Sequence, residues 1–345
     1  MQTPTLNYLE LAGSPYQIGL EAGRFAAEVV HAQLRPSALW ESLQAEVSQD
    51  ILADMQTLTQ QQHPYVLDEI QGMARGLELP FEEVFAWNCR ADLHPQAVAG
   101  STTIMLSGGK PPKIYHNDDG AAALKGHCTL ATITPDSGPA FATLVVPGTL
   151  PGNTFTVTEH GMVIVVDDLR WMDLTPGLPR TVVTRALLTQ PDLSGMITLL
   201  NQSARTGGCH LALAHRGGGS LLSIEFNHDH VYTRAINRPM VHTDHALNPK
   251  WAHTPQLITP SSQARHQLLT QRLEDAPDAH DPLALLADQS HPQWPVFREH
   301  PASDQDGKKT LASVAMEVGP DAVEWAVYEH PQQAVRYHMR DAHHI

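Results

Sequence analysis

The stretch "DLHPQAVAGSTTIMLSGGKPPKIYHNDDG" (residues 92–120) marks a change in the character of the chain. Most of what precedes it has helical spacing. From Ser101 onward, β-branched runs alternate with turn residues. Gly100-Ser101 stands at the change, and Asp119 follows Ser101 by eighteen residues. Taken alone, Gly-Ser favours an ordinary turn, and so does the Asn-Asp-Asp-Gly sequence at 117–120.

The residues before Gly100 predict a mostly helical segment. Ser14-Pro15 is a helix start, and apolar residues recur after it at helical spacing. Gly19 and Gly23 lie four apart in that pattern, which favours close packing against another helix. A second amphipathic pair follows at residues 66–93, broken at Gly76 and Pro80.

The residues after Gly100 predict two batches of strands with helices between them. Alternating β-branched runs separated by Pro-Gly and Asn/Asp punctuation extend to about residue 236 and return at 309–331. Helical spacing occupies residues 178–203, 261–276 and 281–290. No repeat or long linker divides the chain. The sequence therefore favours a layered body of the α+β or four-layer αββα type, with nothing that separates domains.

Composition and charge narrow the classes of partner. The 345 residues carry a net charge of −15, which disfavours nucleic acid and anionic membranes and is compatible with a cationic amine ligand. No run approaches the about 20 apolar residues of a membrane span, and the N-terminus does not resemble a signal peptide. Three cysteines in so long a chain favour a reducing compartment, so we expect a cytoplasmic protein. Homo-oligomer formation is left open.

Gly100-Ser101 also has a chemical interpretation. If the Ser101 hydroxyl attacked the Gly100 carbonyl, an ester would form, and its hydrolysis would leave Ser101 with a free α-amine. Such an amine titrates near ~7.7–8 and can act as a general base. Gly100 would allow a strained backbone at the bond. A carboxylate such as Asp119 could hold the new ammonium group.

Other polar residues give weaker signals. His242 and His245, three residues apart with Asp244 between them, could ligate a metal, but the sequence offers no further strong ligand at a diagnostic spacing, so no metal site is predicted. Arg185, within a helical segment, is more typical of a structural ion pair. No phosphate-binding loop or G-x-S-x-G elbow is present in the sequence.

In order and spacing, several segments resemble the acyl-coenzyme A:6-aminopenicillanic acid acyltransferase family, which includes β-alanyl-amine hydrolases. The resemblance runs nearly end to end. The segments that carry it are "LELAGSPYQIGLEAGRFAAEVV", "DEIQGMARGLELPFEEVFAWNCRADL", "PGLPRTVVTRALL", "VHTDHALNP", "SSQAR" and "TLASVAMEV".

The resemblance implies an αββα N-terminal-nucleophile hydrolase made as a precursor. Cleavage between Gly100 and Ser101 would yield a segment 1–100 and a segment 101–345 within one structural domain. Ser101 falls at the nucleophile position, Asp119 at that of the orienting carboxylate, and Asp244 where the family has an oxyanion-stabilising asparagine. No cofactor is implied. Asn117, Asp168, Arg185, His242 and His245 are further candidates for substrate binding or oxyanion stabilisation.

Two departures from the family pattern stand out. The family usually has cysteine at the Ser101 position, so serine is either the natural nucleophile or an engineered replacement that stalls processing. Asp244 would repel an oxyanion if ionised. Either backbone N–H groups and a histidine (His242 or His245) replace the amide, or Asp244 is protonated, or it binds a positive group. We favour the last, with Asp244 recognising a substrate ammonium.

The expected function is hydrolysis of the linear amide bond of a small N-acyl amine or N-acyl amino acid through an acyl-enzyme on Ser101. Two alternatives stay open. One is an acyltransferase that passes the acyl group to an amine. The other is an arrested precursor that binds ligand without turnover.

Overall fold

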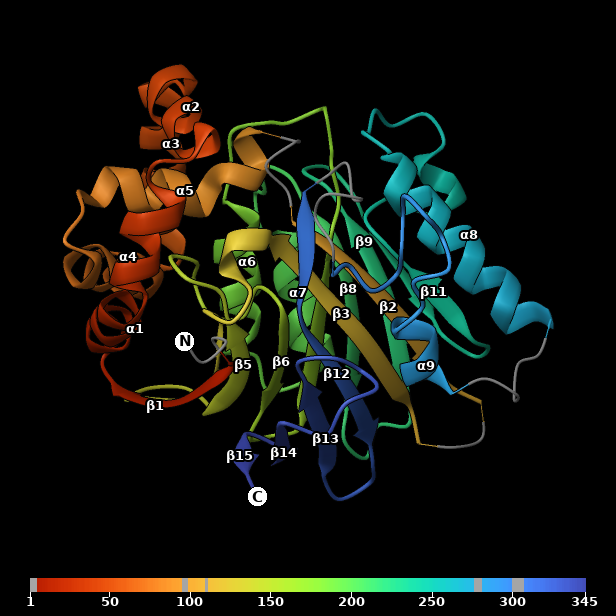
Figure 1. The fold of residues 1–345 in the computed structure, drawn as a ribbon. Coiled ribbons are helices and arrows are strands. Elements are labelled where there is room, and N and C mark those ends of the chain that lie inside the picture. The colour runs from red at the N-terminus through yellow and green to blue at the C-terminus, as the bar shows by residue number, and fades with distance from the viewer. Residues whose placement is uncertain (1–4, 95–98, 109–110, 276–280, 300–306) are drawn as a thin grey trace.

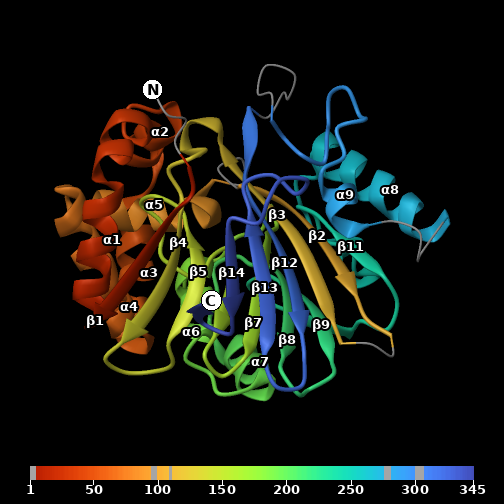
Figure 2. The same ribbon diagram turned by 60° about the horizontal axis from the view of Figure 1, so that its bottom comes forward.

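The computed structural model describes residues 5–94, 99–108, 111–275, 281–299 and 307–345. Within them, two sheets pack face to face between helices (Figures 1 and 2). The helices are α1 (Pro15–Val29), α2 (Ala38–Glu46), α3 (Gln49–Gln62), α4 (Pro64–Leu77), α5 (Phe81–Leu93), α6 (Arg180–Leu187), α7 (Leu193–Gln202), α8 (Pro260–Asp275) and α9 (Pro282–Leu286).

The first sheet has eight strands among the described residues, and only its β1–β4 pair is parallel. In spatial order it contains β1 (Asn7–Gly13), β4 (Thr129–Pro135), β5 (Phe141–Val145), β6 (Phe155–Thr158), β7 (Met162–Asp168), β8 (Cys209–His215), β9 (Leu221–Phe226) and β10 (Val231–Ala235). Because β1 lies in this sheet, the segment before Gly100 contributes a strand as well as helices.

The second sheet has seven antiparallel strands in the described part of the chain. In spatial order it contains β11 (Met240–His242), β2 (Gly100–Leu106), β3 (Lys113–Ala121), β12 (Lys308–Val318), β13 (Val323–Tyr328), β14 (Tyr337–Arg340) and β15 (His343–His344). Strand β2 contacts β7 across the interface between the sheets, while α7 packs on β8 and α8 packs on β2 and β11. The predicted four-layer arrangement is confirmed. No helix among the described residues has the length and apolar character to span a membrane.

Close helix packing explains the glycines of the first helical pair. A Cβ on Gly19 would lie 1.9 Å from the Glu69 carbonyl oxygen of α4, and one on Gly72 would lie 2.0 Å from the Tyr16 carbonyl oxygen of α1. The packing predicted from Gly19 and Gly23 is therefore confirmed. The predicted break between the two helices lies at residues 78–80, because α4 ends at Leu77 and Pro80 precedes α5. Gly76 itself is inside the last turn of α4, where a side chain would clash with the α1 backbone.

The turn favoured at residues 117–120 is also wrong, because these residues lie inside β3. Strand β3 pairs with β2 on one side and β12 on the other, so its backbone groups are used in two ladders. Cross-strand pairing overrides the local turn preference of Asn and Asp, and it places the acidic residues of β3 directly beside Ser101.

Candidate active site

Ser101 is the second residue of β2 and is 3% exposed. In the β2–β3 register, Ser101 stands opposite Asp118, and Gly100 stands opposite Asp119. Directly opposed residues share a face of an antiparallel sheet, and successive residues alternate faces. The side chain of Asp118 therefore shares the face of Ser101, and that of Asp119 lies on the other face.

Asp244 makes the direct contacts with Ser101. Its Oδ1 accepts a hydrogen bond from the Ser101 backbone N–H at 2.7 Å and another from the Ser101 hydroxyl at 3.1 Å. Its Oδ2 is 2.6 Å from Nη2 of Arg265 on α8. Burial alone would raise the pKa of Asp244, but Arg265 and then Arg170 hold it below the usual value. One oxygen of an ionised carboxylate thus accepts hydrogen bonds from both the backbone nitrogen and the hydroxyl group of Ser101.

Two arginines hold the carbonyl groups on either side of the Gly100-Ser101 bond. Arg170 donates to the Ala99 carbonyl oxygen at 3.1 Å, and Arg265 donates from Nη1 to the Ser101 carbonyl oxygen. Arg265 also donates to Thr102 Oγ1 at 2.6 Å. Residues 95–98, just upstream, lie outside the described part of the chain. The backbone around the bond is therefore held in place by charged donors.

Gly100 is needed for space rather than for backbone strain. Its φ is not among the positive values found at other glycines, so the strained conformation expected from the sequence is not observed. A Cβ at this position would lie 3.1 Å from Nη1 of Arg298 and 3.4 Å from both Asp119 Cβ and Asp244 Oδ2. The absent side chain lets two carboxylates and a guanidinium gather beside the bond.

Asp119 is fully buried on the opposite face of the sheet. It accepts a 2.6 Å hydrogen bond from Thr310, and its Oδ2 lies 3.8 Å from Nε of Arg298. In the uncleaved chain the Ser101 nitrogen is bound by Asp244 rather than by Asp119. The orienting role of Asp119 after cleavage remains a prediction.

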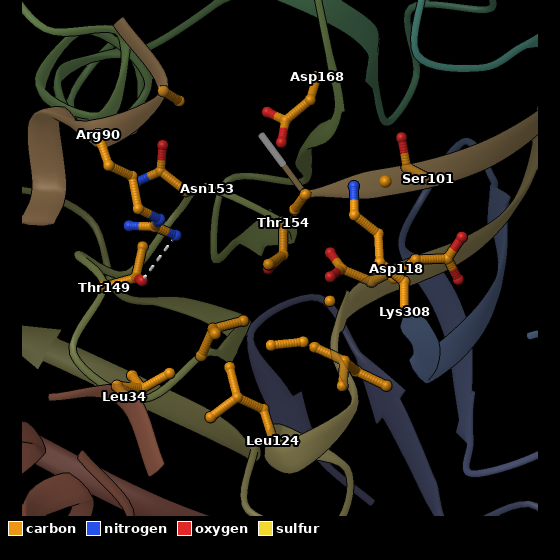
Figure 3. Close-up of a pocket in the computed structure, with 18 of the residues that line it drawn as sticks. Leu34, Arg90, Ser101, Asp118, Leu124, Thr149, Asn153, Thr154, Asp168 and Lys308 are labelled. Carbon is orange, nitrogen blue, oxygen red and sulfur yellow. Dashed lines mark hydrogen bonds between the residues drawn. The ribbon is translucent and has the colours of Figure 1, made fainter. Parts of the chain in front are cut away.

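A cavity of about 410 Å³ opens beside Ser101 (Figure 3). Figure 3 shows Ser101, Asp118 and Lys308 on one side of it, and Arg90, Asn153 and Thr149 on the other. Apolar groups line much of the remaining wall, including Leu34, Leu39, Ala121, Ala123, Leu124, Val146 and Leu311. The cavity can accept a small molecule with an apolar portion beside the Ser101 hydroxyl.

Asp118 is the acid of this cavity that shares the Ser101 face. Burial raises its pKa to about 6, against the opposing effect of His116, whose Nε2 lies 3.7 Å from Asp118 Oδ2. His116 Nδ1 lies 2.9 Å from the Thr103 hydroxyl, which donates to Asp167 at 2.7 Å. A polar path thus leads from the cavity wall into the space between the sheets.

The other predicted site residues divide into two groups. Asp168 lines the cavity and pairs with Arg180 at 2.7 Å. Four predicted residues do not line it. Asn117 donates to the Leu286 carbonyl oxygen, Arg185 pairs with Glu69 at 2.9 Å, His242 lies 3.1 Å from Glu225, and His245 lies 2.7 Å from Ser262. These four make structural contacts in the uncleaved chain.

Asp167, His210 and His242 form a group of metal-ligating type between the sheets, with their ligand atoms within 4.8 Å of one another. The two imidazole rings are stacked at 3.6 Å with an interplanar angle of 8°. Ring lone pairs lie in the ring plane, so two parallel stacked rings do not direct them at one ion. Burial would lower the pKa of His242, but Asp167 and Glu225 raise it to about 9. A protonated His242 between the carboxylates of Asp167 and Glu225 therefore explains why these side chains are clustered.

Two features that distinguish this site were not predicted from the sequence: the position of Asp118 on the face of Ser101, and the ion pair between Arg265 and Asp244. Asp118 was visible as a neighbour of Asp119, and strand alternation would have separated their faces once β3 was recognised. In the sequence, Arg265 appears only as the last residue of the SSQAR segment. No local signal connects it with Ser101, because 164 residues separate the two.

Comparison with known proteins gives one family. The sequence profile of acyl-coenzyme A:6-aminopenicillanic acid acyl-transferases matches residues 107–330, more than half of the chain. The matched region includes Asp118, Asp119, Asp244 and Arg265 and begins just after Ser101. No curated protein sequence matched the chain.

Proposed function

Because the chain belongs to the acyl-coenzyme A:6-aminopenicillanic acid acyl-transferase family, we propose that it is an N-terminal-nucleophile amidohydrolase that cleaves itself between Gly100 and Ser101. At the level of the family, the protein is an acyltransferase or hydrolase. The proposal adds the mode of activation and the reaction: hydrolysis of the linear amide bond of a small N-acyl amine or N-acyl amino acid.

The observation that carries the proposal is the position of Asp244 Oδ1, which contacts both the Ser101 hydroxyl and the Ser101 nitrogen. In self-cleavage the Ser101 oxygen bonds to the Gly100 carbonyl carbon and loses its proton to Asp244. The Gly100–Ser101 C–N bond then breaks, and the nitrogen takes up that proton. Water hydrolyses the resulting ester, leaving a carboxylate on Gly100 and an α-amine on Ser101.

The same groups serve the substrate reaction. The α-amine of Ser101 accepts the hydroxyl proton as Oγ attacks the acyl carbon of the substrate, and it returns that proton to the departing amine. Water then hydrolyses the acyl-enzyme with the α-amine as base. A serine hydroxyl holds its proton more firmly than a thiol, which is why a carboxylate beside it is valuable.

A processing experiment tests the proposal. The purified chain should yield two fragments of about 11 and 27 kDa, in proportion to the 37.8 kDa of the whole, and the larger should begin with Ser101. Ser101→Ala should stay intact, whereas Ser220→Ala, at an exposed loop position, should be cleaved normally. The cleaved protein should release amine from a panel of N-acyl amines and N-acyl amino acids. An intact chain with no amide hydrolysis, even as Ser101→Cys, would refute the proposal.

The family description itself favours a second candidate, acyl transfer to an amine. The acyl-enzyme is common to both reactions, so the identity of the acceptor separates them. Adding a primary amine to the hydrolysis assay should leave the free-acid product dominant if the protein is a hydrolase. A new N-acyl amine that replaces the acid in proportion to the added acceptor would make it a transferase.

A further inference from the structure

Helices α5 and α6 form one wall of the cavity, and this wall carries more positive than negative charge. Arg90 and Arg180 line it there, and Asp168 is the acid that accompanies them. Asp168 is already paired with Nη2 of Arg180 at 2.7 Å. Asp92, also nearby, accepts the backbone N–H of Arg180 and does not line the cavity. Within the described part of the chain, one guanidinium at this end therefore has no carboxylate paired with it.

That guanidinium is Arg90. It lies 4.4 Å above the ring of Trp87, donates to the Trp87 carbonyl oxygen at 2.8 Å, and donates to Thr149 Oγ1 at 3.3 Å (Figure 3). All of these partners are neutral, and no ion pair links Arg90 to a carboxylate within the described residues. Burial lowers its pKa to about 10, and the charge of Asp168 opposes this effect. An arginine has five N–H donors, so most of those on Arg90 are still available.

Arg180 provides a second, independent indication. The residue is 7% exposed, and its Nη1 is buried without a hydrogen-bond partner among the described residues. Buried polar atoms are normally satisfied, and a buried guanidinium nitrogen is among the most costly to leave without an acceptor. Both arginines that line the cavity thus carry N–H groups that no described residue accepts.

We propose that Arg90 and Arg180 bind a substrate carboxylate, and that the substrate is an N-acyl amino acid rather than a cationic amine. This inference rests on the function proposed above and selects between the substrate classes left open there. A carboxylate accepts two parallel N–H bonds from one edge of a guanidinium, and Arg90 has N–H groups that Trp87 and Thr149 do not use. The opposite side of the cavity holds Ser101, so the carboxylate and the amide bond can be bound at once (Figure 3).

The apolar wall defines the rest of the substrate. Leu34 and Leu124 lie below the polar residues in Figure 3, and Val146 and Leu311 line the same cavity. A volume of about 410 Å³ accommodates a short acyl group together with one apolar side chain. The expected class is an N-acyl derivative of an apolar amino acid.

A binding measurement tests the inference separately from catalysis. The uncleaved Ser101→Ala chain is titrated calorimetrically with N-acetylleucine, N-acetylleucinamide and the monobutylamide of succinic acid. The first carries its carboxylate in the amine half, the second is neutral, and the third carries its carboxylate in the acyl half. Loss of a charged hydrogen-bonded contact should make N-acetylleucinamide bind about 10- to 100-fold more weakly than N-acetylleucine. The succinic monoamide should bind less tightly than N-acetylleucine.

Substitutions locate the contact. Arg90→Gln should remove the preference for N-acetylleucine over its amide, and Arg90→Lys should restore it only in part, because an ammonium lacks the two-pronged geometry. Arg24→Gln, at an exposed arginine on α1 paired with Glu21, is the matched control and should keep the full preference. Thermal unfolding of each variant shows whether it is folded.

The outcomes separate this inference from the proposed function. Equal binding of the acid and the amide, or an undiminished preference in folded Arg90→Gln, would overturn the carboxylate site even if the protein hydrolyses neutral amides. Tighter binding of the succinic monoamide would overturn the assignment of the carboxylate to the amine half. A strong acid preference that depends on Arg90 supports the site, including in a chain that never cleaves itself.

Discussion

Replacement of Asp244 by asparagine is the sharpest test of how Ser101 is activated. The substitution keeps the size of the side chain and leaves one oxygen that can still accept a hydrogen bond from the Ser101 N–H. That bond is 2.7 Å long in the unaltered chain. It removes the group that can take the hydroxyl proton across 3.1 Å. General-base catalysis contributes about 10²- to 10⁴-fold to a rate, so self-cleavage of Asp244→Asn should slow by that factor.

The same substitution also affects stability. Asp244 and Arg265 are 1% and 0% exposed and lie 2.6 Å apart, so Asp244→Asn leaves a buried guanidinium without its counter-charge. Removing one partner of such a pair costs about 3–5 kcal/mol. We expect the lower end of that range, because Arg265 still donates to Ser101 and Thr102. Unfolding in urea measures this loss, and processing rates are compared only under conditions where the variant is folded.

A comparison of four chains separates the effect of Asp244→Asn on proton transfer from its effect on stability. Self-cleavage is followed on denaturing gels for Asp244→Asn, Ser101→Cys, the double variant and the unaltered chain. A thiol ionises near ~8.5 and depends less on a neighbouring base, so Asp244→Asn should slow the Ser101→Cys chain at least about tenfold less than the serine chain. Asp173→Asn, at an exposed position, is the matched control and should have no effect. Equal slowing in both backgrounds would refute the assignment of Asp244 as the base.

Three further predictions concern the buried framework. His242 has its pKa raised from 6.5 to about 9, so its stabilising contribution is complete below pH 6.5 and lost as the pH rises through about 9. The fall should be about 3 kcal/mol in urea unfolding between pH 6.5 and 9.5, and His242→Gln should flatten it; an unchanged pH profile would contradict this. Gly72→Ala, which would place a Cβ 2.0 Å from a carbonyl oxygen of α1, should cost about 1–3 kcal/mol through overpacking, and a thermal midpoint equal to that of the unaltered chain would show that the helices can separate. Glu69→Gln removes the partner of Arg185 in a pair no more than 3% exposed and should cost about 3–5 kcal/mol in denaturant unfolding. Glu21→Gln, in an exposed pair, should cost under about 1 kcal/mol, and similar losses for the two variants would contradict the reasoning.

Local patterns in the sequence predicted most of the individual elements. Ser14 caps α1 as expected from Ser14-Pro15, and α8 begins at Pro260, next to the predicted start. Besides β3, which was expected to be a turn, the strands β1, β11, β14 and β15 were not predicted. The edge strands β1 and β11 depend on partners far away in the chain, since β1 pairs with β4 and β11 with β2 across more than a hundred residues. Strands β14 and β15 are only four and two residues long, too short to show an alternating pattern. Elements whose stability is local can be found from periodicity, whereas edge strands that depend on a partner cannot.

The sequence by itself determined the layered α+β class, the family and the position of Ser101 at the start of a strand, because each depends on residue order or on spacing within one element. Only the tertiary structure decided that Asp244, 143 residues away, contacts the Ser101 nitrogen and hydroxyl. It also decided that Asp118 shares the face of Ser101 while Asp119 lies on the other, and that Arg90 faces the cavity without a carboxylate partner among the described residues. These facts depend on strand register and on how separate elements pack. Neither is encoded in local spacing, because a shift of one residue in register would exchange the two faces of β3.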